Sequence, residues 1–146
     1  MKRPANPAYP AELHTLGDHL RKVRLDRGLS QPDVAKILNV ITDSVTGWEL
    51  NRHIPPPRSA KAIIAFLGYF PFMVEGELLG RQLYYARLIT GKTQEEVAAI
   101  VGCDESIVRL IERGARHPKG LILSELQTFI CSALESGPEN SGGNTK

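Results

Sequence analysis

The sequence lacks most features that mark membrane-embedded, secreted or metal-binding proteins. No apolar run in its 146 residues approaches the ~18 residues that a membrane span needs, and its start, Met1 to Pro7, leads into no apolar segment typical of a signal peptide. The two cysteines, Cys103 and Cys131, lie 28 positions apart without a CxxC pair or a histidine at ligand spacing, so no zinc site is predicted. We therefore expect a cytoplasmic protein with reduced thiols.

Charge of one sign and aromatic residues are also scarce. The 18 basic and 16 acidic residues leave a formal net charge of +2, which excludes a polycation held to nucleic acid by bulk charge alone. This balance of charges does not exclude a basic patch on one face of the protein. Aromatic residues contribute only 6%, but hydrophobic residues reach 42%, which is enough for a packed core.

The sequence also lacks a constellation of residues suited to catalysis. Gly28 and Gly91 stand alone and do not form a phosphate-binding loop. No histidine has a serine or cysteine partner, a metal spacing or paired carboxylates nearby; the four are His14, His19, His53 and His117. We expect no enzymatic activity and no cofactor.

What the sequence does contain is an internal repeat. Shifted by 63 positions, residues 16–55 align with residues 79–118 without a gap and agree at 13 of 40 positions. The identical pairs are Leu16/Leu79, Gly17/Gly80, Leu20/Leu83, Arg24/Arg87, Leu25/Leu88, Gly28/Gly91, Gln31/Gln94, Val34/Val97, Ala35/Ala98, Ile37/Ile100, Val45/Val108, Glu49/Glu112 and Pro55/Pro118. One structural unit is therefore expected to occur twice.

The repeat predicts the domain organisation. We expect a flexible N-terminal arm at 1–15, a first domain at 16–72, a second at 73–134 and a disordered tail at 135–146. Each domain is of a size that folds alone but with small stability. The connector contains three large apolar residues, which suit either a partner surface or an interdomain core; we favour the core for Phe70, Phe72 and Met73.

Net charge does not distinguish the two domains. Residues 1–71 carry 10 basic and 6 acidic side chains, and residues 72–146 carry 8 and 10. Within the repeated cores the bias reverses, because residues 16–56 carry 6 against 5 and residues 79–119 carry 7 against 5. The choice of a nucleic-acid-binding half must rest on individual side chains.

Apolar periodicity predicts short helices in the first unit. Leu16, Leu20 and Val23 recur at the spacing of one helix face, and Gly28 ends that helix. The segment Ser30-Gln31-Pro32-Asp33 is a capping box that begins a second helix. A third helix follows, with Asn39 in the turn before it and Val45 and Trp48 facing inward.

The second unit repeats these signals. Thr93-Gln94-Glu95-Glu96 is its capping box, and Asp104 is a good N-cap for its third helix, where Ile41 of the first unit is a poor one. A further helix ends each unit, with apolar residues Ile63, Ile64 and Leu67 in the first and Ile122, Leu126, Phe129, Ile130 and Ala133 in the second. No long stretch alternates with period two, so the fold is predicted to be all-α.

The two short helices and their turn resemble a known family. The run Leu29-Ser30-Gln31-x-x-Val34-Ala35-x-x-Leu38-x-Val40-x-x-x-x-Val45-x-x-Trp48-Glu49-x-Asn51-x-x-x-Pro55 is similar to lambda-repressor-like (Cro/cI-type, XRE) helix-turn-helix proteins. The second unit resembles them again, from Thr93-Gln94-Glu95-Glu96-Val97-Ala98 through Ile111-Glu112-Arg113-Gly114. The resemblance implies two tandem helix-turn-helix domains of four to five short helices each.

The resemblance implies that the third helix of each unit lies in the DNA major groove. Outward positions that would meet base edges are Thr42, Asp43, Thr46 and Gly47 in the first unit, and Glu105, Ser106, Arg109 and Leu110 in the second. Expected phosphate contacts are Gln31, Ser44 and Arg52, and Gln94, Arg113 and Arg116. Lys2 and Arg3 are candidates for a basic arm. The competing interpretation of these side chains is a solvated helix face.

Two repeated ion pairs complete what the resemblance implies. Arg24 with Glu49, and Arg87 with Glu112, would be partly buried salt bridges that tether the third helix to the first. Trp48 lies on the inward side of the third helix, so a core role is favoured over stacking on bases.

The leading hypothesis is a repressor-like, sequence-specific regulator of transcription that binds double-stranded DNA with one or both repeats. It would act in the cytoplasm, associated with the nucleoid through DNA. In the alternative, the first repeat binds DNA and the second is a protein-interaction or dimerisation module, including an antitoxin-like role. A homodimer through residues 122–134 stays open; no membrane and no small-molecule ligand is expected.

Overall fold

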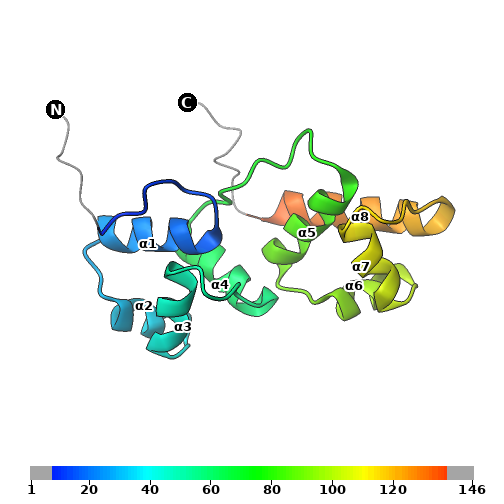
Figure 1. Cartoon of the computed structure of the whole chain (residues 1–146). Helices are drawn as coiled ribbons and strands as arrows, with labels where there is room; N and C mark the ends of the chain where they lie inside the picture. The colour runs from blue at the N-terminus through cyan, green and yellow to red at the C-terminus, as the bar shows by residue number, and fades with distance from the viewer. Residues whose placement is uncertain (1–7, 138–146) are drawn as a thin grey trace. The chain divides into compact units, whose positions relative to one another are not determined.

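A computed structural model describes residues 8–137 of the chain. Over these residues the chain forms eight α-helices and no β-strand, which confirms the all-α prediction (Figure 1). The chain divides into two compact units, Met1–Pro56 and Pro57–Lys146. The outer parts of the expected arm and tail, including Lys2 and Arg3, lie outside the described residues.

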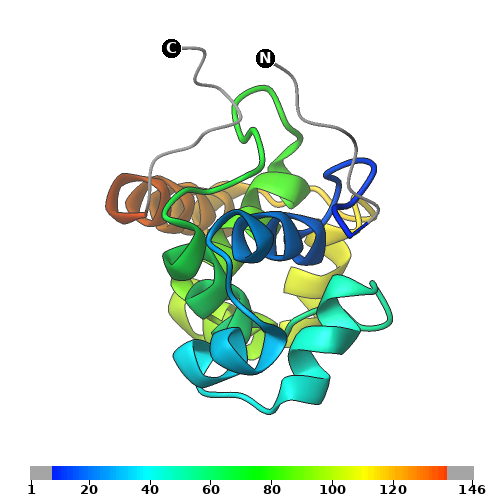
Figure 2. The ribbon, with the colours of Figure 1, turned by 90° about the vertical axis from the view of Figure 1, so that its left-hand side faces the viewer.

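Unit 1 contains three helices: α1 (Leu16–Asp26), α2 (Gln31–Leu38) and α3 (Thr42–Glu49). α3 packs against both α1 and α2, and Figure 2 shows α2 and α3 following one another across a short turn. Leu20, Val34 and Val45 are fully buried, one from each helix. Trp48 is buried on α3, as the sequence predicted.

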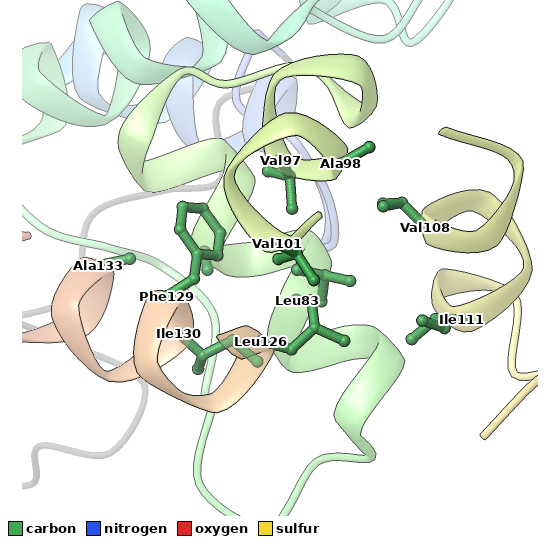
Figure 3. Close-up of a cluster of buried hydrophobic side chains, with 11 residues drawn as sticks. Leu83, Val97, Ala98, Val101, Val108, Ile111, Leu126, Phe129, Ile130 and Ala133 are labelled. Carbon is green, nitrogen blue, oxygen red and sulfur yellow. The ribbon is translucent and has the colours of Figure 1, made fainter. Parts of the chain in front are cut away.

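Unit 2 contains five helices: α4 (Pro57–Leu67), α5 (Leu79–Thr90), α6 (Gln94–Val101), α7 (Glu105–Glu112) and α8 (Gly120–Ser136). α5 packs against α4, α7 and α8, and α6 packs against α7 and α8. In Figure 3, side chains from α5 to α8 point toward one another, with Leu83, Val97, Val108 and Leu126 fully buried.

The division of the chain differs from the expected boundary at residues 72 and 73. Residues 57–72 belong to the second unit, because α4 packs against α5. Phe70 is buried there and meets Tyr85 of α5 edge-on at 5.3 Å, while Phe72 stacks on Tyr85 at 5.4 Å. Phe70 is therefore part of the interior of unit 2, Phe72 is half-buried and Met73 is exposed; the expected interdomain core stays a prediction.

Local hydrogen bonds explain where the helices begin. The predicted capping boxes at Ser30/Asp33 and Thr93/Glu96 are both present, and a third at Thr15/Asp18 begins α1. Thr15 thus belongs to a formed helix cap and not to a flexible arm. At the other end, α8 extends through Ser136, so residues 135 and 136 are helical and not part of a disordered tail.

One expected cap does not form. Asp104 occupies the N-cap position of α7, but its side chain makes no capping hydrogen bond. Its counterpart Ile41 precedes α3 and has none either. The predicted turn geometry is confirmed, because Asn39 and Gly102 both adopt left-handed backbone angles, with φ of 60° and 88°.

A glycine lets α1 and α3 of unit 1, and α5 and α7 of unit 2, approach closely. A Cβ atom at Gly17 would overlap the backbone carbonyl of Trp48, and one at Gly80 would overlap the carbonyl oxygen of Ile111. Backbone atoms cannot yield as a flexible side chain can, so no larger residue fits without separating the helices. This contact fixes α3 against α1, and α7 against α5.

Candidate nucleic-acid interface

A buried ion pair joins α1 to α3 in unit 1. Arg24 donates from Nε and Nη2 to the two carboxylate oxygens of Glu49, at 2.7 and 2.8 Å, and from Nη1 to the carbonyl oxygen of Leu29 at 2.9 Å. The side chains of Arg24 and Glu49 are only 11% and 1% exposed. The salt bridge implied by the resemblance is therefore confirmed, and its geometry is the bidentate form that fixes orientation best.

The same carboxylate also holds the first residue of α2. Gln31 donates from Nε2 to Glu49 at 3.0 Å, and its carbonyl oxygen accepts a hydrogen bond of 2.7 Å from the hydroxyl of Thr46. Two expected contact residues are thus bonded to each other. An amide nitrogen carries two hydrogens and a hydroxyl keeps acceptor lone pairs, so both side chains retain bonding capacity toward a ligand.

Unit 2 repeats this framework of arginine, glutamate and glutamine. Arg87 donates to both oxygens of Glu112, at 2.6 and 2.9 Å, and to the carbonyl oxygen of Lys92 at 3.2 Å. Gln94 donates to Glu112 at 3.0 Å. Arg109 stands where unit 1 has Thr46, and it pairs with Glu105 at 3.6 Å. We call Arg24, Glu49 and Gln31 of unit 1, and likewise Arg87, Glu112 and Gln94 of unit 2, the Arg–Glu–Gln framework.

The outer face of α3 carries most of the expected reading positions of unit 1. Asp43 is exposed, and Thr42, Ser44 and Thr46 are half-buried. Gly47 differs from the expected outward position, because it is buried. The loop after α3 returns over the helix, and the ring of His53 lies against Gly47 at the place a side chain would take.

The outer face of α7 carries more charge. Its exposed residues are Glu105, Ser106 and Arg109, followed by Arg113 and Arg116 after the helix, while Leu110 is half-buried. The charges of Arg109 and Glu105 offset each other in part, since both side chains are about half exposed and only 3.6 Å apart. In unit 1, Arg52 is likewise exposed beyond the end of α3.

A cavity of about 670 Å³ opens beside α7 in unit 2. Three arginines line it, Arg81, Arg109 and Arg113, together with Gln94 and the framework carboxylate Glu112; the remaining lining residues are Glu77, Leu78, Gly80, Tyr84 and Gly114. It therefore brings three expected contact residues together, from α6, α7 and the turn after α7.

Two residues that line this cavity, Arg81 and Tyr84, were not predicted from the sequence. The guanidinium groups of Arg81 and Arg87 lie 6.0 and 5.7 Å from the centre of the Tyr84 ring. Burial raises the pKa of the Tyr84 hydroxyl, so the ring stays neutral between the two cations. The repeat alignment held a signal for Arg81, because it stands where unit 1 has Asp18.

In unit 1 a hydrogen-bonded network takes the corresponding positions. Asn51 donates to Asp18 at 2.9 Å and accepts from the hydroxyl of Thr15 at 2.8 Å. Burial would raise the pKa of the Asp18 carboxyl, but hydrogen bonds from Asn51 and from the backbone of His14 and Thr15 outweigh it and lower the pKa. Asp18 is thus an anion where unit 2 has a cation.

Two further observations bear on the kind of site. Among residues 8–137, no group of three or more His, Cys, Asp or Glu side chains could hold a metal ion. No helix within that range has the length and apolar character to cross a membrane.

Comparison of the chain with protein-family models, curated proteins and solved structures gives no match.

Proposed function

We propose that the chain is a sequence-specific, double-stranded DNA-binding regulator of transcription with two tandem lambda-repressor-like helix-turn-helix domains. It would act in the cytoplasm, associated with the nucleoid through its DNA. The observation that carries this proposal is the recurrence of the Arg–Glu–Gln framework in both units. The framework ties the N-terminus of α2 to α3 in unit 1, and the N-terminus of α6 to α7 in unit 2.

The framework has the properties that a reading helix needs. A side chain that reads base edges must be held firmly, since each good base contact contributes only about 1–3 kcal/mol of discrimination. Glu49 and Glu112 fix α3 and α7 from their inner faces, and their outer faces stay accessible. Gln31 and Gln94 stand at helix N-termini, where backbone N–H groups favour a phosphate.

The two outer faces predict unlike half-sites. Asp43 in unit 1 would accept from cytosine N4, and Thr42 and Thr46 would bond a base edge or touch a thymine methyl group. In unit 2, Arg109 would donate to guanine, and the arginine cavity would receive backbone phosphates. A dimer of identical chains reads a symmetric site, so a chain with two different faces favours an asymmetric one.

A specific observation favours the alternative, in which unit 2 binds protein and only unit 1 binds DNA. Glu105 leads the outer face of α7 and would be repelled by phosphates.

The test is a selection of preferred sites from random duplex DNA by the full chain. Affinity for the selected site is then measured across a salt titration, for the wild type and for Arg52→Glu and Arg113→Glu, which reverse one exposed charge in each unit. If both variants bind more weakly, both units contact DNA. If only Arg52→Glu does, unit 2 is the interaction module. A wild type without sequence preference refutes the proposed function.

A further inference from the structure

We propose that His53 is a base-reading residue of unit 1, where it supplies the side chain that Gly47 lacks. This inference rests on the proposed DNA-binding function and names a specificity-determining residue of the same site. It concerns a residue of the loop after α3, outside the helix that carries the other reading positions.

The imidazole ring of His53 lies against Gly47. A Cβ atom built on Gly47 would meet Cδ2, Nε2 and Cγ of His53 as its three nearest atoms, and it would overlap the first two. The ring therefore occupies the space into which a side chain at position 47 would project. Gly47 is buried while His53 is exposed, so the ring is the solvent-facing group at this point of α3.

Backbone hydrogen bonds fix this arrangement. The amide N–H of Asn51 donates to the carbonyl oxygen of Trp48 at 3.1 Å, and that of Arg52 donates to Gly47 at 2.8 Å. Asn51 has a φ of 60°, in the left-handed region, which reverses the chain direction after the helix. These bonds bring His53 back over the last turn of α3, so its approach to Gly47 does not depend on side-chain torsions alone.

The ring of His53 lies on the same face of α3 as the other expected reading positions. Thr46 and Gly47 follow Asp43 by three and four residues, so both lie on the face of α3 that carries Asp43. A neutral imidazole offers one N–H donor and one nitrogen acceptor. Beside the acceptor Asp43, the donor suits the N7 of a purine or the O6 of guanine at a neighbouring base pair.

Unit 2 supplies an internal comparison. Its corresponding loop makes the same turn, with the amide N–H of Ala115 donating to Leu110 at 2.9 Å and Gly114 at a φ of 76°. Leu110 has the side chain that Gly47 lacks, and Arg116 stands in the place of His53. The arrangement of an imidazole over a glycine is therefore specific to unit 1, and its removal must affect one half-site only.

The experiment repeats the site selection with full-chain wild type, His53→Ala, Gly47→Ala and the double variant. We expect His53→Ala to lose about tenfold discrimination at one base pair of the unit 1 half-site, with the other half-site unchanged. Gly47→Ala places a methyl group where the flexible ring lies and displaces it. It should reproduce the loss, and the double variant should lose no more than either single one. His14→Ala, which removes another exposed histidine of unit 1, is the matched control and should keep the wild-type preference.

Each other outcome overturns the inference in a recognisable way. If His53→Ala selects the same sequences with the same affinity, His53 does not read DNA, although the proposed function stands. If it weakens binding to all sequences equally and reduces the salt dependence, His53 contacts phosphate only. If Gly47→Ala keeps the preference that His53→Ala loses, the ring does not act from above Gly47. A wild type with no sequence preference overturns both this inference and the proposed function.

Discussion

Arg24 donates hydrogen bonds to both carboxylate oxygens of Glu49, at 2.7 and 2.8 Å, although the two residues lie 25 positions apart in the sequence. Glu49 accepts from Gln31 as well, so one carboxylate joins all three helices of unit 1. Since Glu49 is only 1% exposed, its charge has little access to water and depends on these partners. The position of α3 relative to α1 and α2 therefore depends on the buried side chain of Glu49.

The first prediction concerns this carboxylate. Glu49→Ala leaves the guanidinium of Arg24 buried without its counter-ion, which typically costs about 3–5 kcal/mol of unfolding free energy. We expect a lower melting temperature, followed by the fluorescence of Trp48, the only tryptophan of the chain. Glu112→Ala makes the same change in unit 2 and serves as the matched comparison by circular dichroism. An unchanged melting temperature for Glu49→Ala would show that the pair contributes nothing to stability.

The second prediction compares two glycines of unit 1. A methyl group at Gly17 would overlap the carbonyl of Trp48 and force α1 away from α3, so Gly17→Ala should cost about 3 kcal/mol. Gly28→Ala meets nothing within 4 Å but strains a backbone with a φ of 69°, which costs about 1 kcal/mol. Urea denaturation followed by Trp48 fluorescence measures both. Equal losses would mean that the α1–α3 contact is not sterically limited.

The third prediction is a pH dependence of stability. Burial acts to raise the pKa of Asp18, but hydrogen bonds from Asn51 and the backbone lower it below its ordinary 3.8. Because the folded pKa lies below the unfolded one, the stabilisation is present above pH 3.8 and is lost as the pH falls from there through the folded pKa. Asp18→Asn should therefore be less stable than the wild type near neutral pH, and the difference should shrink in acid.

Asn51→Gly is the control for this pH dependence. Glycine keeps the left-handed conformation that Asn51 adopts, as Gly114 does in unit 2, but it removes the hydrogen bond to Asp18. The pKa of Asp18 should then rise, and the acid-sensitive part of the stability should become smaller. Identical acid-denaturation curves for Asn51→Gly and the wild type would exclude Asn51 as a cause of the lowered pKa.

The fourth prediction tests the arginine cavity of unit 2. If Arg113 contacts a phosphate, Arg113→Ala should reduce the slope of log K against log salt by about one and weaken binding on all sequences alike. Lys36→Ala removes an exposed cation that is not assigned to the interface, and its slope should match the wild type. A slope unaffected by Arg113→Ala would show that Arg113 makes no phosphate contact.

Local features of this fold could be read from the sequence, because their partners are near in the chain. The capping boxes at Ser30 and Thr93 and the left-handed turn at Asn39 follow from residue types a few positions apart. The cap expected at Asp104 failed even at this range, since the right residue type does not ensure the hydrogen bond.

Features that depend on distant partners were less accessible. The apolar stripe of α4 predicts that the helix packs on one side, but it does not identify α5 as the partner. The sequence therefore predicts a domain boundary after α4, whereas the structure has it before α4. Nothing in the sequence links His53 to Gly47, because their contact arises from the turn at Asn51. The Arg–Glu pairs were anticipated only through the resemblance, and the role of Gln31 and Gln94 in them was not.

The identities between the two repeats now have a physical meaning. They include the framework residues and the buried contacts between helices, such as Gly17 with Gly80 and Val45 with Val108. The exposed positions of α3 and α7 share none: Thr42 and Asp43 face Glu105 and Ser106 in the alignment. Interior and outer face are therefore separable parts of one unit. The exposed residues of α3 should therefore be exchangeable for those of α7 without disturbing the buried core of either unit. A change of binding specificity would then need substitutions on the outer face alone.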